Sequence, residues 1–184
     1  MAEKKKFFDV ELPLIKGKIK LLALDIGQLN GRIVKIDMTR SLRGKGLEII
    51  FKVKVKGEKA IGEVIKAYLM QFYIRRMMRK AVSYIEDSFS VESENSILQI
   101  KPFLITRNKV IRRVRRALRE AAKKYIEEYV QEKNTEEIFS DILSNKFQKT
   151  LSLKLKKIYP LALCEIRQII LQKKKEKIKE EKVK

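Results

Sequence analysis

Alternating apolar and polar residues in the first half of the chain predict β-strands. The clearest example is the stretch 47–56 (LEIIFKVKVK), in which Phe51, Val53 and Val55 alternate with lysines. A strand with this pattern has one apolar face for a core and one cationic face. Further strands are predicted at residues 19–24, 32–38 and 60–67 and, as a hairpin, at 82–91 and 97–103. Their short connections favour a meander or a barrel.

Apolar residues spaced three and four positions apart predict helices in the second half of the chain. The strongest pattern covers residues 109–124 (KVIRRVRRALREAAKK), where Val114 and Leu118 fall on one face. Thr106 or Asn108 is the expected cap at the start of this helix. Other helices are predicted at 69–81 and, from Asn134 or Thr135 onward, in two short pieces divided near Ser144-Asn145, before a last strand at 161–171.

Together these elements predict an α+β fold, in which a barrel-like, mixed or mostly antiparallel sheet is accompanied by a long basic helix and shorter helices. We divide the chain into a basic extended arm at residues 1–17, a single α+β domain at 18–172, and a basic mobile tail at 173–184. Pro13 and Gly17 interrupt the arm, and the tail has no apolar face to bury.

Charge changes the picture, because 44 Lys and Arg residues against 23 Asp and Glu residues give a formal net charge of +21. A chain this basic favours an anionic partner such as RNA, DNA or an acidic membrane surface. The charge is concentrated in the helix predicted at 109–124, whose five arginines precede its first carboxylate, Glu120. We therefore predict that these arginines lack ion-pair partners within the helix and bind a polyanion; the alternative is a solvated charged face.

Arginine suits this role, since its planar guanidinium can bind phosphate bidentately or stack on a base. Tyr73, beside a second basic cluster, could also stack on a base, but an aromatic residue at helical spacing is more often part of a core. The residues that we predict to bind RNA are basic side chains of the arm, a glycine-containing loop, the regions around two helices, and the tail: Lys4, Lys5, Lys6, Arg40, Arg43, Lys45, Arg75, Arg76, Arg79, Lys80, Arg107, Lys109, Arg112, Arg113, Arg115, Arg116, Arg119, Lys173, Lys174 and Lys175.

Composition argues against several kinds of site. The chain has no histidine and one cysteine, Cys164, which excludes an internal disulfide and leaves structural zinc without its usual ligands. Acid–base catalysis would need carboxylates or lysines instead of histidine. The best candidates for a metal or acid–base site are Glu86, Asp87, Glu92 and Glu94, but we interpret them as solvated hairpin residues. We predict no enzyme activity, catalytic residue, metal, cofactor or small-molecule substrate.

Two further classes of motif are missing from the sequence. It contains neither a GxxxxGK[ST] phosphate-binding loop nor a dinucleotide-binding GxGxxG between a strand and a helix. It also contains no run of about eighteen apolar residues, and the N-terminus (MAEKKKFF) lacks the apolar core of a signal peptide. We therefore expect a cytoplasmic protein with no membrane partner.

Several short motifs occur in the order known from one protein family. They are Phe8-Asp9-Val10 before Pro13, Gly31-Arg32-Ile33 before Asp37-Met38, Tyr73-Ile74-Arg75 with Arg79-Lys80, Lys101-Pro102, Val114-Arg115, and Ile158-Tyr159-Pro160-Leu161 before Glu165-Ile166-Arg167. In this order and spacing, the chain resembles over nearly its whole length the archaeal and eukaryotic small-subunit ribosomal protein family S-one-e, also called S-three-Ae.

The resemblance implies a β-barrel-like domain with helices, on the platform side of the small ribosomal subunit in the cytoplasm. It implies three partners: small-subunit rRNA near its 3′ end, neighbouring platform proteins, and mRNA near its exit. The residues by themselves predict only a basic RNA-binding domain. Three other functions stay open at this point: a carboxylate-metal nuclease, a DNA- or RNA-compacting or chaperone-like protein outside the ribosome, and a peripheral membrane protein.

Overall fold

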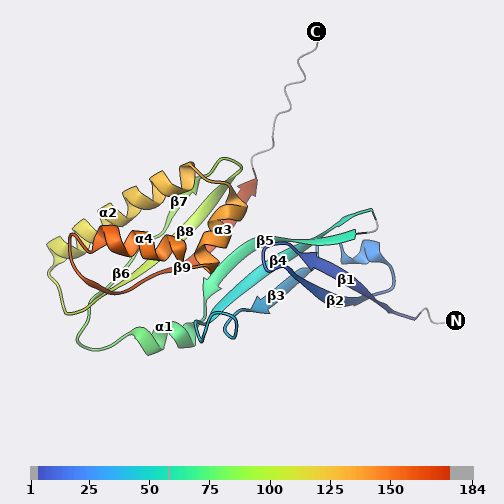
Figure 1. Cartoon of the computed structure of the whole chain (residues 1–184), viewed down its shortest axis with the longest axis horizontal. Coiled ribbons are helices and arrows are strands. Elements are labelled where there is room, and N and C mark those ends of the chain that lie inside the picture. Colours follow the sequence, from blue (N-terminus) through green and yellow to red (C-terminus); the bar gives the residue numbers. More distant parts are fainter. Residues whose placement is uncertain (1–3, 58, 175–184) are drawn as a thin grey trace, which may run out of the picture. The chain divides into compact units, whose positions relative to one another are not determined.

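The computed structural model of the chain describes residues 4–57 and 59–174. The chain divides between Arg75 and Arg76 into two compact units. The short helix α1 (Gln71–Met77) contains this division. Figure 1 shows the order of the elements along the chain. The prediction that residues 18–172 form a single domain stays a prediction.

The first unit is built on a sheet in which both strand directions occur. Its elements are β1 (Lys6–Leu12), β2 (Gly17–Ala23), the 3-10 helix η1 (Ile26–Leu29), β3 (Ile33–Asp37), β4 (Leu47–Lys56) and β5 (Lys59–Leu69). β1 pairs antiparallel with β2 and parallel with β5, and β4 pairs antiparallel with both β5 and β3. Within the described residues no pairing joins β2 to β3, so this sheet is mixed and open, and it does not close into a barrel.

Alternation along β4 produces the core of the first unit as the sequence predicts. Phe51 and Val53 are fully buried, whereas Lys52 between them is exposed. Gly62 of β5 is required by close packing, because a Cβ atom there would lie 2.3 Å from Cδ2 of Leu12 in β1. A side chain at position 62 would therefore force the buried Leu12 side chain to move where β1 and β5 run side by side.

Residues 6–12 differ from the predicted extended arm, because they form the paired strand β1. Val10 and Leu12 are 1% and 2% exposed, so this stretch contributes to the core. Pro13, which we expected to interrupt the arm, lies in a tight turn in which the Ile15 N–H donates to the Leu12 carbonyl at 3.2 Å. The turn leads directly into β2, and the two strands form a hairpin.

The second unit packs helices on one face of an antiparallel sheet (Figure 1). Its elements are β6 (Tyr84–Glu86), β7 (Phe89–Glu92), β8 (Ser96–Thr106), α2 (Arg112–Gln131), α3 (Thr135–Leu143), α4 (Lys146–Leu155) and β9 (Leu161–Lys174). β8 is the central strand and pairs with β6, β7 and β9. Helix α2 contacts β6 and β7, and α4 contacts both α2 and β9. The α+β class and the long basic helix are thus confirmed.

Several predicted boundaries in this half of the chain move. The strand predicted at 82–91 is divided into β6 and β7, and the helix predicted at 69–81 is only Gln71–Met77. Helix α2 begins at Arg112 after Ile111, not at a cap on Thr106 or Asn108. Thr106 is instead fully buried at the end of β8, where its hydroxyl donates to the Ser83 carbonyl at 3.0 Å.

The division between the last two helices is confirmed. Helix α3 starts at Thr135 after Asn134, and α4 starts after Asn145, which adopts a positive φ of 58°. Aromatic packing holds α4 against α2, since the rings of Tyr129 and Phe147 lie 4.7 Å apart, edge to face. This contact and the packing of α2 on β6 and β7 together hold the helix in place within the second unit.

Candidate nucleic-acid interface

Helix α2 has one buried stripe and one cationic surface. Leu118, Ala122, Ile126 and Val130 follow each other at intervals of four residues and are at most 1% exposed. This spacing places them on the side of the helix that packs on the sheet and on α4. The arginines of its first two turns are left outside this stripe, and all of them are exposed except Arg115, which is partly exposed.

These arginines form the wall of a single hollow, which we call the arginine groove. It has a volume of about 600 Å³ and is lined by Tyr84 of β6 and by five residues of α2: Arg112, Arg113, Arg115, Arg116 and Arg119. A neighbouring hollow of about 340 Å³ shares Tyr84, Arg115 and Arg119 with it. The structure thus gathers onto one concave surface all five of the arginines that the sequence placed in one helix.

Only one of the five arginines has a carboxylate partner within the described residues. Arg116 Nε lies 2.8 Å from Glu120 Oε1, one turn further along α2, which corrects the prediction that all five lack intrahelical partners. The hydrogen bond with Glu120 raises the pKa of Arg116. Both side chains are well exposed, at 81% and 64%, so solvent screens this pair and the groove keeps its positive potential.

The start of α2 adds to the positive potential of the groove. The partial positive charge at a helix N-terminus favours anions, yet the first turn of α2 contains no acidic residue and begins with Arg112 and Arg113. At Arg115 of the same helix, Nε is covered and has no hydrogen-bond partner among the described residues, which is unfavourable. An anion in the arginine groove would interact favourably with the start of α2 and with the exposed arginines.

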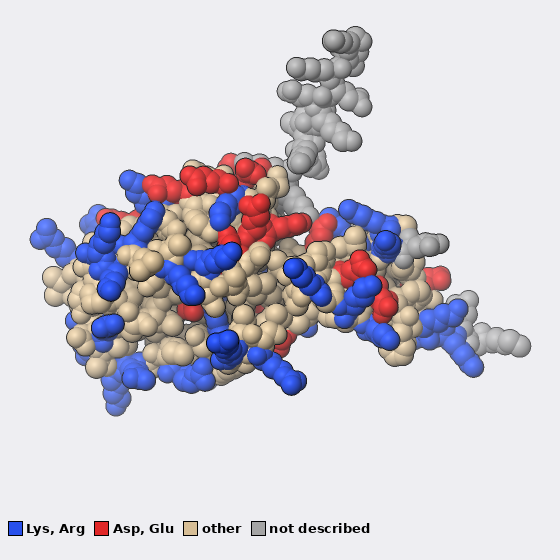
Figure 2. Space-filling view, in the orientation of Figure 1, with Lys and Arg blue, Asp and Glu red and all other residues tan. Residues whose placement is uncertain are grey.

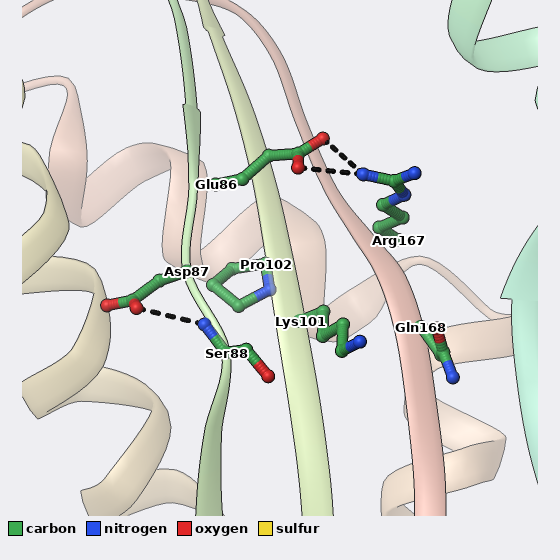
Figure 3. Close-up of a pocket in the computed structure, with 7 residues that line it drawn as sticks. All are labelled: Glu86, Asp87, Ser88, Lys101, Pro102, Arg167 and Gln168. Carbon is green, nitrogen blue, oxygen red and sulfur yellow. Dashed lines mark hydrogen bonds and ion pairs between the residues drawn. The ribbon is translucent and has the colours of Figure 1, made fainter.

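The hairpin carboxylates Glu86 and Asp87, which the sequence offered as candidates, do not form a catalytic or metal site. Both Oε atoms of Glu86 lie 2.7 Å from Nη1 of Arg167, and Asp87 accepts a hydrogen bond from the Ser88 N–H at 2.9 Å. Figure 3 shows that Glu86 reaches across β8 toward Arg167, whereas Asp87 points the opposite way. In residues 4–57 and 59–174, no three acidic or cysteine side chains gather to hold a metal ion.

Comparison with known proteins now identifies the chain. The model of the ribosomal S3Ae family matches residues 1–175. The chain belongs to this family. It is also 27% identical over 178 residues, 92% of its own length and 90% of the relative's, to the small ribosomal subunit protein eS1 of Nanoarchaeum equitans (strain Kin4-M). The resemblance that the motifs indicated is confirmed.

Membership of the S3Ae family decides between classes of function that the sequence left open. The family is one of structural ribosomal components, so the chain is a ribosomal protein of the cytoplasm and not an enzyme. The nuclease hypothesis therefore falls. Among the described residues, none of the helices combines the length and the apolar character needed to cross a membrane.

The other predicted RNA-binding residues of this S3Ae-family chain do not line the arginine groove. Those that are exposed occur in β1 and the residues before it, in the loop before β4, in and after α1, and between β8 and α2: Lys4, Lys5, Lys6, Arg40, Arg43, Arg75, Arg76, Arg79, Lys80, Arg107 and Lys109. Lys45 differs from them, because it is only 8% exposed. Lys173 and Lys174 end strand β9 instead of beginning a tail, and Lys175 lies outside the described residues.

Acidic residues cluster at the opposite end of α2. Figure 2 shows Lys and Arg gathered around the start of the helix and Asp and Glu along its edge toward the C-terminal end. The acidic side chains of this region include Glu127, Glu128 and Glu132 of α2 and its end, and Glu136 and Glu137 of α3. The charge of α2 is therefore uneven, and a polyanion is attracted most strongly to its first half.

A polar cluster beside these acids joins α2 to α3. Asp141 Oδ2 accepts hydrogen bonds from Lys133 Nζ at 2.6 Å and from the Tyr129 hydroxyl at 2.7 Å. Burial alone would raise the pKa of Asp141, but these two hydrogen bonds outweigh it and lower the pKa below its ordinary value. The same contacts raise the pKa of Lys133, so both side chains stay charged near neutral pH.

Sequence reasoning missed one residue of the groove, Tyr84. We considered Tyr73 as an aromatic side chain beside arginines, and the interpretation that it belongs to the core is correct, since it is 7% exposed. Tyr84 is 54% exposed and lines the groove. A signal was present, because alternation in a strand with Ile85 inside places Tyr84 outside. The sequence could not indicate which arginines it would face.

Proposed function

We propose that the chain is a structural component of the small ribosomal subunit that holds small-subunit rRNA, with the arginine groove as its principal contact. The observation that carries this proposal is the groove itself: five arginines of one helix line one hollow, and four of them have no ion-pair partner in the described part of the chain. The similarity to the Nanoarchaeum relative, a small ribosomal subunit protein, supports the choice of subunit.

Phosphate groups of RNA match the chemistry of this surface. Guanidinium groups bind phosphate oxygens through charge-assisted and often bidentate hydrogen bonds. Bound phosphates would also interact favourably with the N-terminal end of α2. Because the formal net charge of the chain is +21, assembly with a polyanion removes most of its self-repulsion. The groove thus has the shape and the charge that a folded RNA backbone requires.

The remaining exposed cations extend the proposed contact beyond the groove. They are the residues predicted from the sequence before and in β1, in the loop before β4, around α1, and between β8 and α2. We assign them to further phosphates of the same rRNA. Neighbouring platform proteins and mRNA near its exit are the other partners that we propose, on the basis of the family resemblance.

A charge-matched pair of variants tests this proposal. In the first variant the four unpaired arginines of the groove, Arg112, Arg113, Arg115 and Arg119, are changed to Gln. In the second variant four exposed lysines of the α4 region, Lys146, Lys149, Lys156 and Lys157, are changed to Gln. Both variants lose the same charge, and Gln keeps a helix propensity close to that of Arg and Lys.

Affinity for a structured small-subunit rRNA fragment is measured against salt concentration. The wild-type protein should lose affinity steeply with salt, and the log-log slope should become shallower by about 3 in the groove variant, at about 0.7 to 0.9 for each phosphate that is no longer neutralised. The lysine variant should change the slope much less. An equal loss for both variants would show that net charge alone binds RNA, and duplex DNA competing as well as structured RNA would favour the nucleic-acid-compacting alternative.

A further inference from the structure

Tyr84 is placed where an aromatic ring can meet a nucleic-acid base. It is the first residue of the short strand β6, and its neighbour Ile85 is buried at 3% exposure while Tyr84 is 54% exposed. Alternation in the strand therefore turns its ring away from the core and into the arginine groove. A large ring that is half exposed in a hollow is available to stack on a flat ligand.

The size and lining of the groove suit a single nucleotide. Its volume of about 600 Å³ is within the range of about 300 to 1,000 Å³ that is usual for pockets that bind small ligands. One wall offers a phenol ring, and the other offers guanidinium groups of α2. A nucleotide presents the complementary pair of groups, a flat base and a phosphate.

Arg115 supplies the second observation. Its Nε is covered by neighbouring atoms and lacks an acceptor within the described residues, although the residue lines both the arginine groove and the smaller hollow beside it. The cover on Nε withdraws part of this guanidinium from water, and a negatively charged group nearby stabilises a cation in that position. The only carboxylate that lines the smaller hollow, Glu86, is already bound to Arg167.

We propose that the arginine groove takes one unpaired nucleotide of the bound RNA, with its base stacked on Tyr84 and its phosphate against the guanidinium groups of α2. This inference rests on the proposed function and makes it more specific. A base inside an A-form helix cannot reach Tyr84, because both of its faces are stacked on neighbours. The groove therefore recognises a bulge, a loop or a single-stranded end, and a continuous duplex is bound only through its phosphates.

Two RNA probes that differ only by one bulged nucleotide distinguish these modes of binding. One is a fully paired duplex, and the other carries a single bulged 2-aminopurine, a fluorescent base whose emission falls when it stacks. Wild-type protein should bind the bulged probe about 5- to 150-fold more tightly than the paired one, the range expected for one stacked base, and should quench its fluorescence. Tyr84→Phe keeps the ring and should behave like wild type.

Tyr84→Leu removes the ring at an exposed position, so folding should be preserved, which a urea unfolding curve checks. The Leu variant should lose the preference for the bulge and the quenching, while its affinity for the paired duplex stays within about twofold. Phe72→Leu, a change at a ring that is 52% exposed but does not line the groove, should leave the preference intact.

Failure of this inference differs from failure of the proposed function. Equal wild-type affinity for the two probes, or a bulge preference that survives in Tyr84→Leu, overturns the nucleotide site but leaves binding of phosphates by the groove standing. Equal loss of both probes in Tyr84→Leu also overturns it, because Tyr84 would then act without regard to pairing. If the groove variant with four Gln residues binds both probes as wild type does, the proposed function fails, and the nucleotide site fails with it.

Discussion

Leu118 is fully buried on α2 within the segment whose arginines line the groove, so Leu118→Ala separates the packing of this helix from its binding. The substitution removes three carbon atoms from the core, worth about 2.4 kcal/mol at 0.8 kcal/mol for each buried carbon. The cavity left behind adds to this loss when its walls cannot collapse. The total expected decrease in the free energy of unfolding is therefore about 2 to 5 kcal/mol.

Urea unfolding measures this decrease. With an m-value of about 2 kcal/mol per M, the midpoint should fall by about 1 to 2.5 M. Leu153→Ala provides the matched control, since Leu153 lies on α4 with 68% of its surface exposed, and the same substitution there should change the stability by at most about 0.5 kcal/mol. RNA affinity is then measured without urea, where Leu118→Ala is still largely folded, and should stay within about twofold of wild type.

Two results would refute this assignment of the faces of α2. If Leu118→Ala is no more destabilising than Leu153→Ala, then Leu118 does not pack in the core. If Leu118→Ala abolishes RNA binding at unchanged stability, the apolar stripe belongs to the binding surface. Circular dichroism of each variant shows whether the loss is one of folding or of binding.

Three further predictions concern other parts of the chain. The pKa of Asp141 is lowered in the folded protein, so its carboxylate stabilises the fold at pH values above its ordinary pKa of 3.8, and this contribution is lost as the pH falls. Asp141→Asn should therefore lower the free energy of unfolding by about 1 to 3 kcal/mol at pH 7 and flatten the acid limb of a plot of thermal midpoint against pH. An unchanged acid limb would contradict this. Gly62→Ala should destabilise the first unit by about 1 to 3 kcal/mol, because the added Cβ overlaps with Leu12. Gly17→Ala is the control and should be tolerated, because nothing lies within 4 Å of the Cβ added there. Equal urea midpoints for the two variants would count against close packing at Gly62. Glu86→Gln removes a carboxylate beside the groove and should strengthen RNA binding at low salt but not at high salt. A loss of affinity at low salt would instead show that the ion pair of Glu86 with Arg167 supports the binding surface.

Patterns with a short period were predictable from the sequence, because they depend only on neighbours along the chain. The alternation of Phe51 and Val53 with lysines identified β4, and the spacing through Leu118 identified the buried face of α2. Once one face of an element is apolar, burial of that face follows from the hydrophobic effect whatever the partner is. The cationic face of α2 was predictable for the same reason, since charged side chains take the side that the core leaves free.

Pairing between distant segments was decided only by the tertiary structure. The sequence predicted that Val10 and Leu12 belong to an extended arm, but their strand β1 pairs with β2 on one side and with β5 on the other, and no local pattern indicates a parallel partner some fifty residues away. The pair of Arg116 with Glu120 is of the other kind, because the two residues lie four positions apart in one helix and their contact could have been predicted from the sequence.

The arginine groove combines both kinds of information. Five arginines in one helix could be read directly from the sequence, but the hollow that they line exists because β6 lies beside α2 and carries Tyr84 on its outward face. Whether an aromatic ring is buried, as Tyr73 is, or exposed among guanidinium groups, as Tyr84 is, depends on packing between elements that are far apart in the chain. The sequence by itself determined the charge and the amphipathic faces of this protein, and the tertiary structure decided which residues share a site, because only non-local packing brings separate faces together.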